Sequence, residues 1–148
     1  MWQYCGARVN KAIVRRWFEE LFSRGNLEVV EEIISPEYVL HDPGFPKDIR
    51  GTEGFKQFIT ALRTAFPDLH STLEDVMAAE GSKVVTRDTW GGTNQGTFLG
   101  FPPTNRQVRA LGIDIFRIAD GKIVEQWASP HLLGAAVRLG VVSLPEHP

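Results

Sequence analysis

The sequence predicts an α+β fold, with N-terminal helices packed on one face of a curved antiparallel sheet. Its hydrophobic period is that of helices up to Pro67 and that of strands afterwards. Helices followed by a run of strands favour two layers, one of helices and one of sheet. The chain also holds nine Phe, four Trp and two Tyr in 148 residues. Many of them lie in its first half, so we expect them between the layers, where any gap becomes an apolar pocket.

Three helices are expected before the change of period. In each, apolar residues recur every three or four positions, and the first helix covers 10–24. The residues that cap or end the helices are Asn10 and Gly25 for the first, Asn26 and Pro36 for the second, and Thr52 and Pro67 for the third. A short extended segment over 37–41 and a loop rich in Pro and Gly over 42–51 separate the second helix from the third.

Five strands and a final helix are expected after Pro67. The strands alternate apolar and polar residues over 69–79, 83–92, 96–99, 106–117 and 122–127. Asp120-Gly121 between the last two strands is a strong hairpin signal. Consecutive strands joined by such short links pair antiparallel. A helix over 132–139 then ends at Gly140.

Length and composition indicate one domain over residues 1–148. Apolar residues make up 43% of the chain and charged residues 23%, as in an ordinary globular protein. The net charge of −2 argues against nucleic-acid binding, and no apolar run reaches the roughly 18–20 residues that span a bilayer. The first nine residues lack the apolar centre of a secretory signal, so a cytoplasmic location is the expectation.

Several kinds of site are not expected. The single cysteine, Cys5, allows no internal disulfide, and it lies in a terminus that we expect to fray. No histidine pair at metal spacing stands with a carboxylate, so no metal is expected. The chain has no glycine-rich phosphate loop and no Gly-x-Ser-x-Gly nucleophile motif. Any chemistry would therefore rest on side chains alone, without a cofactor.

Asp114 is the first candidate for that chemistry. The two-residue period of its strand places it on one face with Gly112 and Phe116, and Phe116 suggests that this face points inward. Burial beside a phenylalanine would raise the pKa of the Asp114 carboxyl and suit it to general acid–base catalysis. The alternative is an exposed Asp114 balanced by Arg117.

Other polar residues could line the same pocket. On period alone, either Arg87 with Thr89 or Asp88 with Trp90 faces inward, and an inward Arg87 could hold Asp114 or a substrate oxygen. His41, at the end of the extended segment, could donate or accept a proton. Each also has a plain structural alternative, a solvated edge charge or a loop histidine. Three further polar candidates are Tyr38, Gln126 and His131.

Short motifs along the chain then identify a family. The most specific are Leu-Gly-Phe-Pro-Pro-Thr at 99–104 and the stretch 112–127 with its Asp-Gly-Lys-Ile hairpin. They are accompanied by 14–22 with Gly-Asn at 25–26, 36–39 with His-Asp-Pro at 41–43, 51–58, 65–68, 92–96, and the Leu-Gly pairs at 133–134 and 139–140. Together, over about residues 9–140, they resemble the SnoaL-like polyketide cyclases (ester cyclases) of the nuclear-transport-factor-2-like superfamily.

The resemblance implies a cone-shaped molecule with a deep, mostly apolar pocket between helices and sheet. Family cyclases close a ring by intramolecular aldol condensation of a polyketide ester, with an aspartate as acid and base and no cofactor. Carried over residue by residue, that aspartate position holds Ala128, which cannot move a proton, and a pocket histidine of the family matches Asp114. The related epoxide hydrolases place an arginine at Arg87 and an aspartate at Thr89, which implies that these two residues face inward.

The sequence therefore predicts an enzyme without cofactor or metal that acts on an apolar, oxygenated small molecule. The proposed catalytic residues are Asp114 for proton transfer and His41 or Arg87 to polarise a carbonyl. The proposed substrate-binding residues are Trp17, Tyr38, Phe58, Thr89, Phe116, Gln126, Ala128 and His131. Two alternatives stay open: a binding module without catalysis, and a hydrolase that resembles the epoxide hydrolases. Exposed Trp90 or Trp127 on the outer sheet face would indicate a homodimer.

Overall fold

The computed structural model describes residues 2–146, so Met1 and the last two residues of the expected domain lie outside the described residues. The first helix begins at Trp2 instead of Asn10: α1 covers Trp2–Arg16 and includes the exposed Cys5. It continues as a π-helix, η1, over Trp17–Ser23. Gly25 then ends the helix as predicted, with a φ of +66° and a hydrogen bond of 3.0 Å from its N–H to the carbonyl of Leu21.

The second helix is shorter than expected. A 3₁₀ turn, η2 (Leu27–Val29), leads into α2 (Val30–Ile33), and the chain is already extended at β1 (Ile34–His41). Pro36 therefore lies inside a strand, where the register of β1 on its neighbour shifts. Proline cannot donate to a strand ladder, so it lies at such irregularities. The short strand β2 (Ile49–Arg50) and α3 (Gly51–Ala65) follow.

The remaining strands form the sheet that the sequence predicts. They are β3 (His70–Ala79), β4 (Lys83–Thr93), β5 (Gln107–Ala119) and β6 (Lys122–Pro130). The strand order is β2-β1-β6-β5-β4-β3, with antiparallel neighbours except for the parallel pair β1–β6. The strand expected over 96–99 is reduced to a single bridge between Phe98 and Phe101, because Leu99 and Gly100 turn the chain with positive φ.

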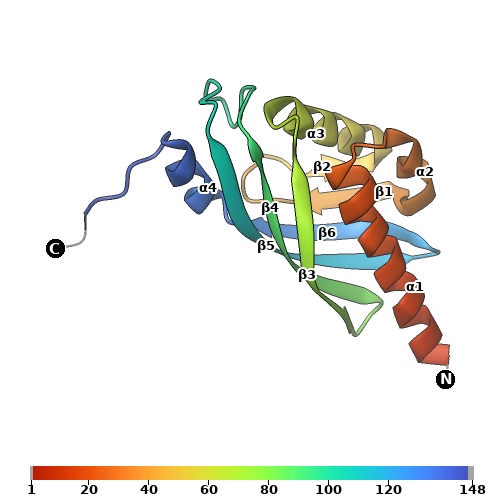
Figure 1. Ribbon diagram of the computed structural model, residues 1–148. Coiled ribbons are helices and arrows are strands. Elements are labelled where there is room, and N and C mark those ends of the chain that lie inside the picture. Colours follow the sequence, from red (N-terminus) through yellow and green to blue (C-terminus); the bar gives the residue numbers. More distant parts are fainter. Residues whose placement is uncertain (1, 147–148) are drawn as a thin grey trace.

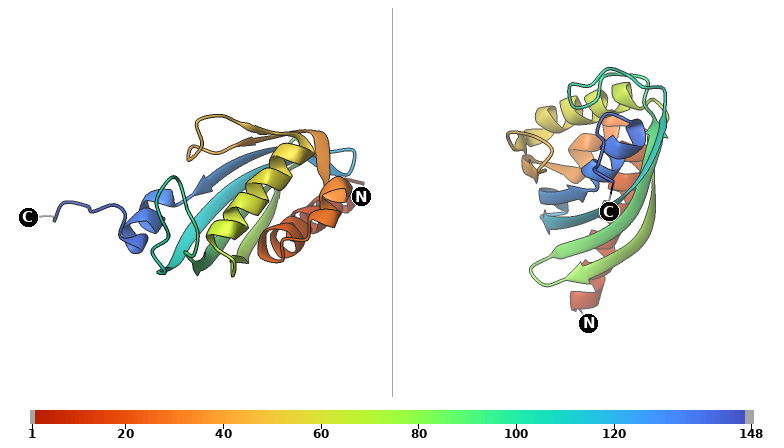
Figure 2. Two further views of the ribbon diagram at one scale, coloured as in Figure 1. Left: turned by 90° about the horizontal axis from the view of Figure 1, so that it is seen from above. Right: turned by 90° about the vertical axis from the view of Figure 1, so that its left-hand side faces the viewer.

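The layers are those expected, since α1 and α3 cover one face of a curved, unclosed sheet (Figure 1). The last helix, α4 (Leu132–Leu139), packs near β5 at one end (Figure 2). We call the helix-covered side of the sheet its inner face and the other side its outer face. The core lies on the inner face, with fully buried Leu21, Tyr38, Phe55, Phe66 and Phe116. Within residues 2–146, no helix has the length and apolar character that crossing a membrane requires.

Candidate active site

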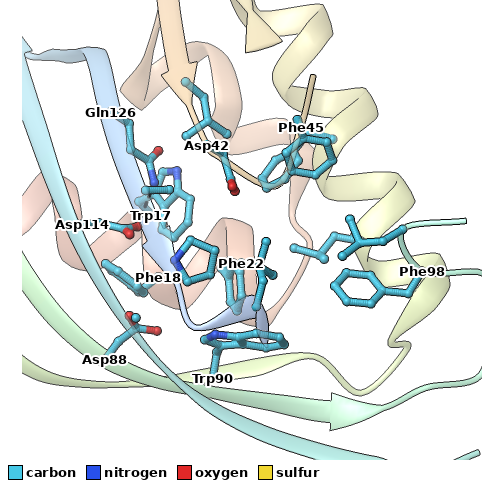
Figure 3. Close-up of a pocket in the computed structure, with 18 residues that line it drawn as sticks. Trp17, Phe18, Phe22, Asp42, Phe45, Asp88, Trp90, Phe98, Asp114 and Gln126 are labelled. Atoms are coloured by element: carbon cyan, nitrogen blue, oxygen red, sulfur yellow. Dashed lines mark hydrogen bonds between the residues drawn. The ribbon is translucent and has the colours of Figure 1, made fainter. Parts of the chain in front are cut away.

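A cavity lies between the inner face of the sheet and the helices (Figure 3). Its wall is mostly aromatic and aliphatic, built by Trp17, Phe18, Phe22, Leu40, Phe45, Phe58, Leu62, Trp90, Phe98, Leu99 and Leu132. Three carboxylates and one amide interrupt this apolar wall: Asp42, Asp88, Asp114 and Gln126. The cavity therefore fits an apolar molecule, with a few fixed polar groups to orient it.

The π-helix η1 shapes the aromatic side of the cavity. It buries Trp17, Phe18, Leu21 and Phe22, and three of these four line the cavity. π-helical turns inside longer helices are rare, and many of those that occur lie at functional sites. The ring of Trp17 stacks on that of Phe22 with 5.5 Å between the ring centroids, and it forms a T-shaped pair with Phe116 at a centroid distance of 5.4 Å. Trp17 and Phe58 thus lie where the sequence predicts, whereas Phe116 supports the wall from behind without lining the cavity.

Asp114 points inward from β5 and is only 7% exposed. Its Oδ2 accepts a hydrogen bond of 3.0 Å from Nε2 of Gln126, and its Oδ1 accepts one of 3.3 Å from the backbone N–H of Ser129. The hydroxyl of Tyr38 donates to Oε1 of Gln126 at 2.6 Å, which turns the Gln126 amino group toward Asp114. Burial and the charge of Asp88 raise the pKa of Asp114 to about 7. The expected inward orientation of this carboxylate is confirmed.

Two further carboxylates line the cavity: Asp88, which belongs to the alternative inward pair of its strand, and Asp42, which was not among the expected site residues. Asp88, on β4, accepts a hydrogen bond of 2.6 Å from the Ser71 hydroxyl, and burial is the main reason why its pKa is raised. Asp42, just after β1, accepts one of 2.8 Å from the backbone N–H of Gly44, and burial raises its pKa too. Within residues 2–146, no group of three His, Cys, Asp or Glu side chains is placed to hold a metal ion.

The space that Asp88 occupies depends on a glycine of the next strand. Gly112 is its register partner on β5. A Cβ at Gly112 would lie 2.5 Å from Oδ1 of Asp88, closer than real Cβ contacts. The absence of a side chain at Gly112 therefore leaves the space beside β5 that the Asp88 carboxylate occupies.

The expectation that Arg87 and Thr89 face the cavity is wrong. Both lie on the outer face: the Arg87 guanidinium pairs with Asp75 at 2.7 Å, and the Thr89 hydroxyl donates to Glu74 at 3.1 Å. The alternation of β4 has the opposite phase, with buried Val84, Thr86, Asp88 and Trp90. Arg87 therefore cannot hold Asp114, and the arginine–aspartate pair of a hydrolase is not assembled.

His41 also lies on the outer face, against expectation. Its Nε2 is 2.8 Å from Glu125 and its Nδ1 is 3.1 Å from Asp48, and its ring stacks on Trp127. The hydrogen bond to Glu125 is the main reason why the pKa of His41 is raised. His41 cannot polarise a carbonyl in the cavity from there.

The other predicted residues divide into two groups. Gln126 and Ala128 line the cavity, whereas Tyr38 is fully buried behind Gln126 and orients it. His131 is exposed at the start of α4, outside the residues that line the cavity. Asp88 and Trp90 are the second pair that the period of β4 allowed to face inward, and in the structure they share the buried phase of Val84.

Comparisons with known proteins agree with this architecture. The model of the family described as SnoaL-like polyketide cyclase matches residues 12–137. Aklanonic acid methyl ester cyclase DnrD of Streptomyces peucetius is 33% identical in an alignment of 132 positions that covers 86% of this chain and 88% of that protein. Nogalonic acid methyl ester cyclase of Streptomyces nogalater is 31% identical over 121 residues, 80% and 89% of the two chains. The solved structure of TsrD from Streptomyces laurentii superposes with a TM-score of 0.80 at 30% identity, covering 91% and 97%.

Proposed function

Because the chain belongs to the SnoaL-like polyketide cyclase family, we propose that it closes a ring in a polyketide ester with Asp114 as acid and base. Two similar proteins are named as methyl ester cyclases, which favours an ester substrate. The apolar wall of the cavity suits the carbon skeleton of such a molecule. No cofactor enters the proposed reaction.

The buried carboxylate of Asp114 is the observation that supports this proposal. A general base works best when its pKa lies near the working pH, and burial brings that of Asp114 to about 7. Gln126 and the Ser129 N–H each hold one carboxylate oxygen, so the group is fixed in direction. Each oxygen keeps a lone pair for a proton from the substrate.

The position of Asp114 also lets it replace the acid–base group that is missing at Ala128. Asp114 on β5 and Ala128 on β6 are direct register partners. Side chains of such partners lie on one face with Cβ atoms about 4.5–5.5 Å apart. The small Ala128 leaves room for the carboxylate of its neighbour, so a base can serve the same part of the cavity from the adjacent strand.

In the proposed reaction, Asp114 takes a proton from the carbon next to a substrate carbonyl. The electrons of that C–H bond form the carbon–carbon double bond of an enolate, and the carbonyl π electrons move to oxygen. The enolate carbon then attacks a second carbonyl carbon of the same molecule and forms the new C–C bond. The oxygen of that second carbonyl receives the proton back from Asp114, so neither water nor an electron carrier is consumed.

Replacing Asp114 tests the proposal. We expect Asp114→Asn to lower the turnover of aromatic polyketide methyl esters by about 10²–10⁴-fold while the protein still binds them. The matched control is Asp75→Asn, which removes a carboxylate from the outer face and should keep full activity. Equal activity of Asp114→Asn and wild type would reject the role of Asp114. Binding without turnover by the wild type would instead favour a binding module.

We also propose that the chain forms a homodimer and lies in the cytoplasm. The outer face carries exposed Leu111, Ile113 and Ile115 on β5, an apolar stripe of the kind that marks interfaces. The tryptophans expected there contribute little: Trp90 faces the cavity, and Trp127 is half-buried under the Lys83 ammonium and beside His41. Cell fractionation would test the location.

A further inference from the structure

Two indole N–H groups in the cavity wall have no hydrogen-bond partner. They belong to Trp17 and Trp90, which are only 3% and 6% exposed. A buried donor without a partner costs about 1–3 kcal/mol, and buried polar groups are nearly always paired in native proteins. The Thr86 hydroxyl is also unpaired, but it does not line the cavity. Among the described residues, the unpaired buried donors on side chains that line the cavity are therefore these two indoles.

The rings that carry these donors are held in place by packing. Trp17 stacks on Phe22 and forms a T-shaped pair with Phe18 at a centroid distance of 4.8 Å, and Trp90 forms one with Phe66 at 6.2 Å. An indole N–H cannot accept a hydrogen bond and cannot rotate away from its ring. Donors with such fixed directions fit an acceptor oxygen without reorganisation.

The two donors lie at different sides of the cavity. In Figure 3, Trp17 stands beside Gln126 and Asp114, whereas Trp90 lies beside Asp88 with the nitrogen edge of its ring toward that carboxylate. The three cavity carboxylates disfavour a negatively charged ligand. The occupant that satisfies both donors is therefore neutral and brings two acceptor oxygens.

We infer that Trp17 and Trp90 donate hydrogen bonds to two oxygens of an uncharged substrate. The inference rests on the proposed function, because Trp17 would hold the carbonyl beside the carbon that Asp114 deprotonates. The negative charge of the enolate then develops on an oxygen that already accepts the Trp17 N–H. Trp90 holds the second oxygen, so the substrate class is an apolar, enolisable dicarbonyl compound.

Nuclear magnetic resonance of the indole N–H groups tests this inference directly. The probe is 1-phenyl-1,5-hexanedione, an enolisable diketone whose two oxygens are separated by a flexible chain, and the comparison ligand is butylbenzene, which has no oxygen. We expect the diketone to move the Trp17 and Trp90 N–H signals downfield and to leave Trp127, on the outer face, unmoved. Butylbenzene should bind without these downfield shifts. Signals that do not move, move for only one tryptophan, or move equally with both ligands would overturn the inference, as would failure of the diketone to bind.

Phenylalanine variants give an independent measurement, since Phe keeps an aromatic ring but no N–H. Trp17→Phe and Trp90→Phe should each weaken diketone binding about fivefold to tenfold and change butylbenzene binding less than twofold. Trp127→Phe is the matched control. A loss of affinity for both ligands alike would show that the indoles only pack. Downfield shifts without any ring closure by the wild type would contradict the proposed function alone, whereas an inactive Asp114→Asn with unmoved indole signals would contradict only this inference.

Discussion

At the scale of single residues, the pKa of Asp114 depends on the charge of a second carboxylate in the cavity, Asp88. The charge of Asp88 is one cause of the raised pKa of Asp114. Asp88→Asn removes that charge, so we predict a lower pKa for Asp114 and an acidic limb of the kcat/KM profile that moves to lower pH. Asp75→Asn, on the outer face, should leave the profile unchanged. An acidic limb at the same pH in Asp88→Asn and wild type would contradict the effect of the Asp88 charge on the pKa of Asp114.

Asp114 should also make folding stability depend on pH. Its carboxyl has a pKa of about 7 when folded and about 3.8 when unfolded, so the folded state binds the proton more tightly. This stabilisation is complete below pH 4 and is lost as the pH rises through 7. Between these limits we expect the free energy of unfolding to fall by up to about 4 kcal/mol more in the wild type than in Asp114→Asn. Denaturant titrations across this range measure the difference, and parallel pH curves would refute the buried titration.

At the scale of elements, the sequence predicts features that the local period determines and misses features that depend on a neighbouring element. The strand period placed Asp114 correctly, and Gly25 and the Asp120-Gly121 hairpin, both at positive φ, were correctly located. Val85 and Val84 are both apolar, so the phase of β4 could not be chosen from period alone, and the resemblance favoured the wrong one. The π-helix keeps the apolar spacing of an α-helix, so the sequence pattern cannot distinguish the two. The burial of Asp88 requires Gly112 on another strand.

This cross-strand dependence makes Gly112 a sharp test of how β4 and β5 form the site. A methyl group at Gly112 would meet Oδ1 of Asp88 at 2.5 Å and push the carboxylate off the Ser71 hydroxyl. We expect Gly112→Ala to destabilise the protein by about 1–3 kcal/mol and to lower activity. Gly6→Ala, in the exposed part of α1, is the control. No atom lies within 4 Å of a Cβ added at Gly6, so the stability of this variant should stay the same or rise. Thermal unfolding and kcat/KM measure both, and an unaltered Gly112 variant would contradict the crowding.

At the scale of the whole molecule, we assign separate tasks to the two faces of one sheet. The inner face carries the carboxylate to which we assign the acid–base chemistry. On the outer face, the stripe of Leu111, Ile113 and Ile115 lies beside charged residues such as Arg87, the register partner of Ile113. An apolar centre with a polar rim is the usual anatomy of a protein interface. The side chains of one strand alternate between the faces, so the stripe can be altered without touching Asp114.

Leu111→Lys combined with Ile113→Lys should therefore abolish a dimer without abolishing the active site. A lysine on each side of a symmetric interface brings like charges into an apolar contact, which costs several kcal/mol. We predict that the wild type sediments as a dimer and the double variant as a monomer that keeps ring-closing activity per chain. Val9→Lys, an equally exposed apolar position on α1, should remain dimeric. A wild type that sediments only as a monomer would remove the homodimer. Loss of activity in a folded, monomeric double variant would instead mean that the cavity needs the second subunit, because these side chains point away from the cavity.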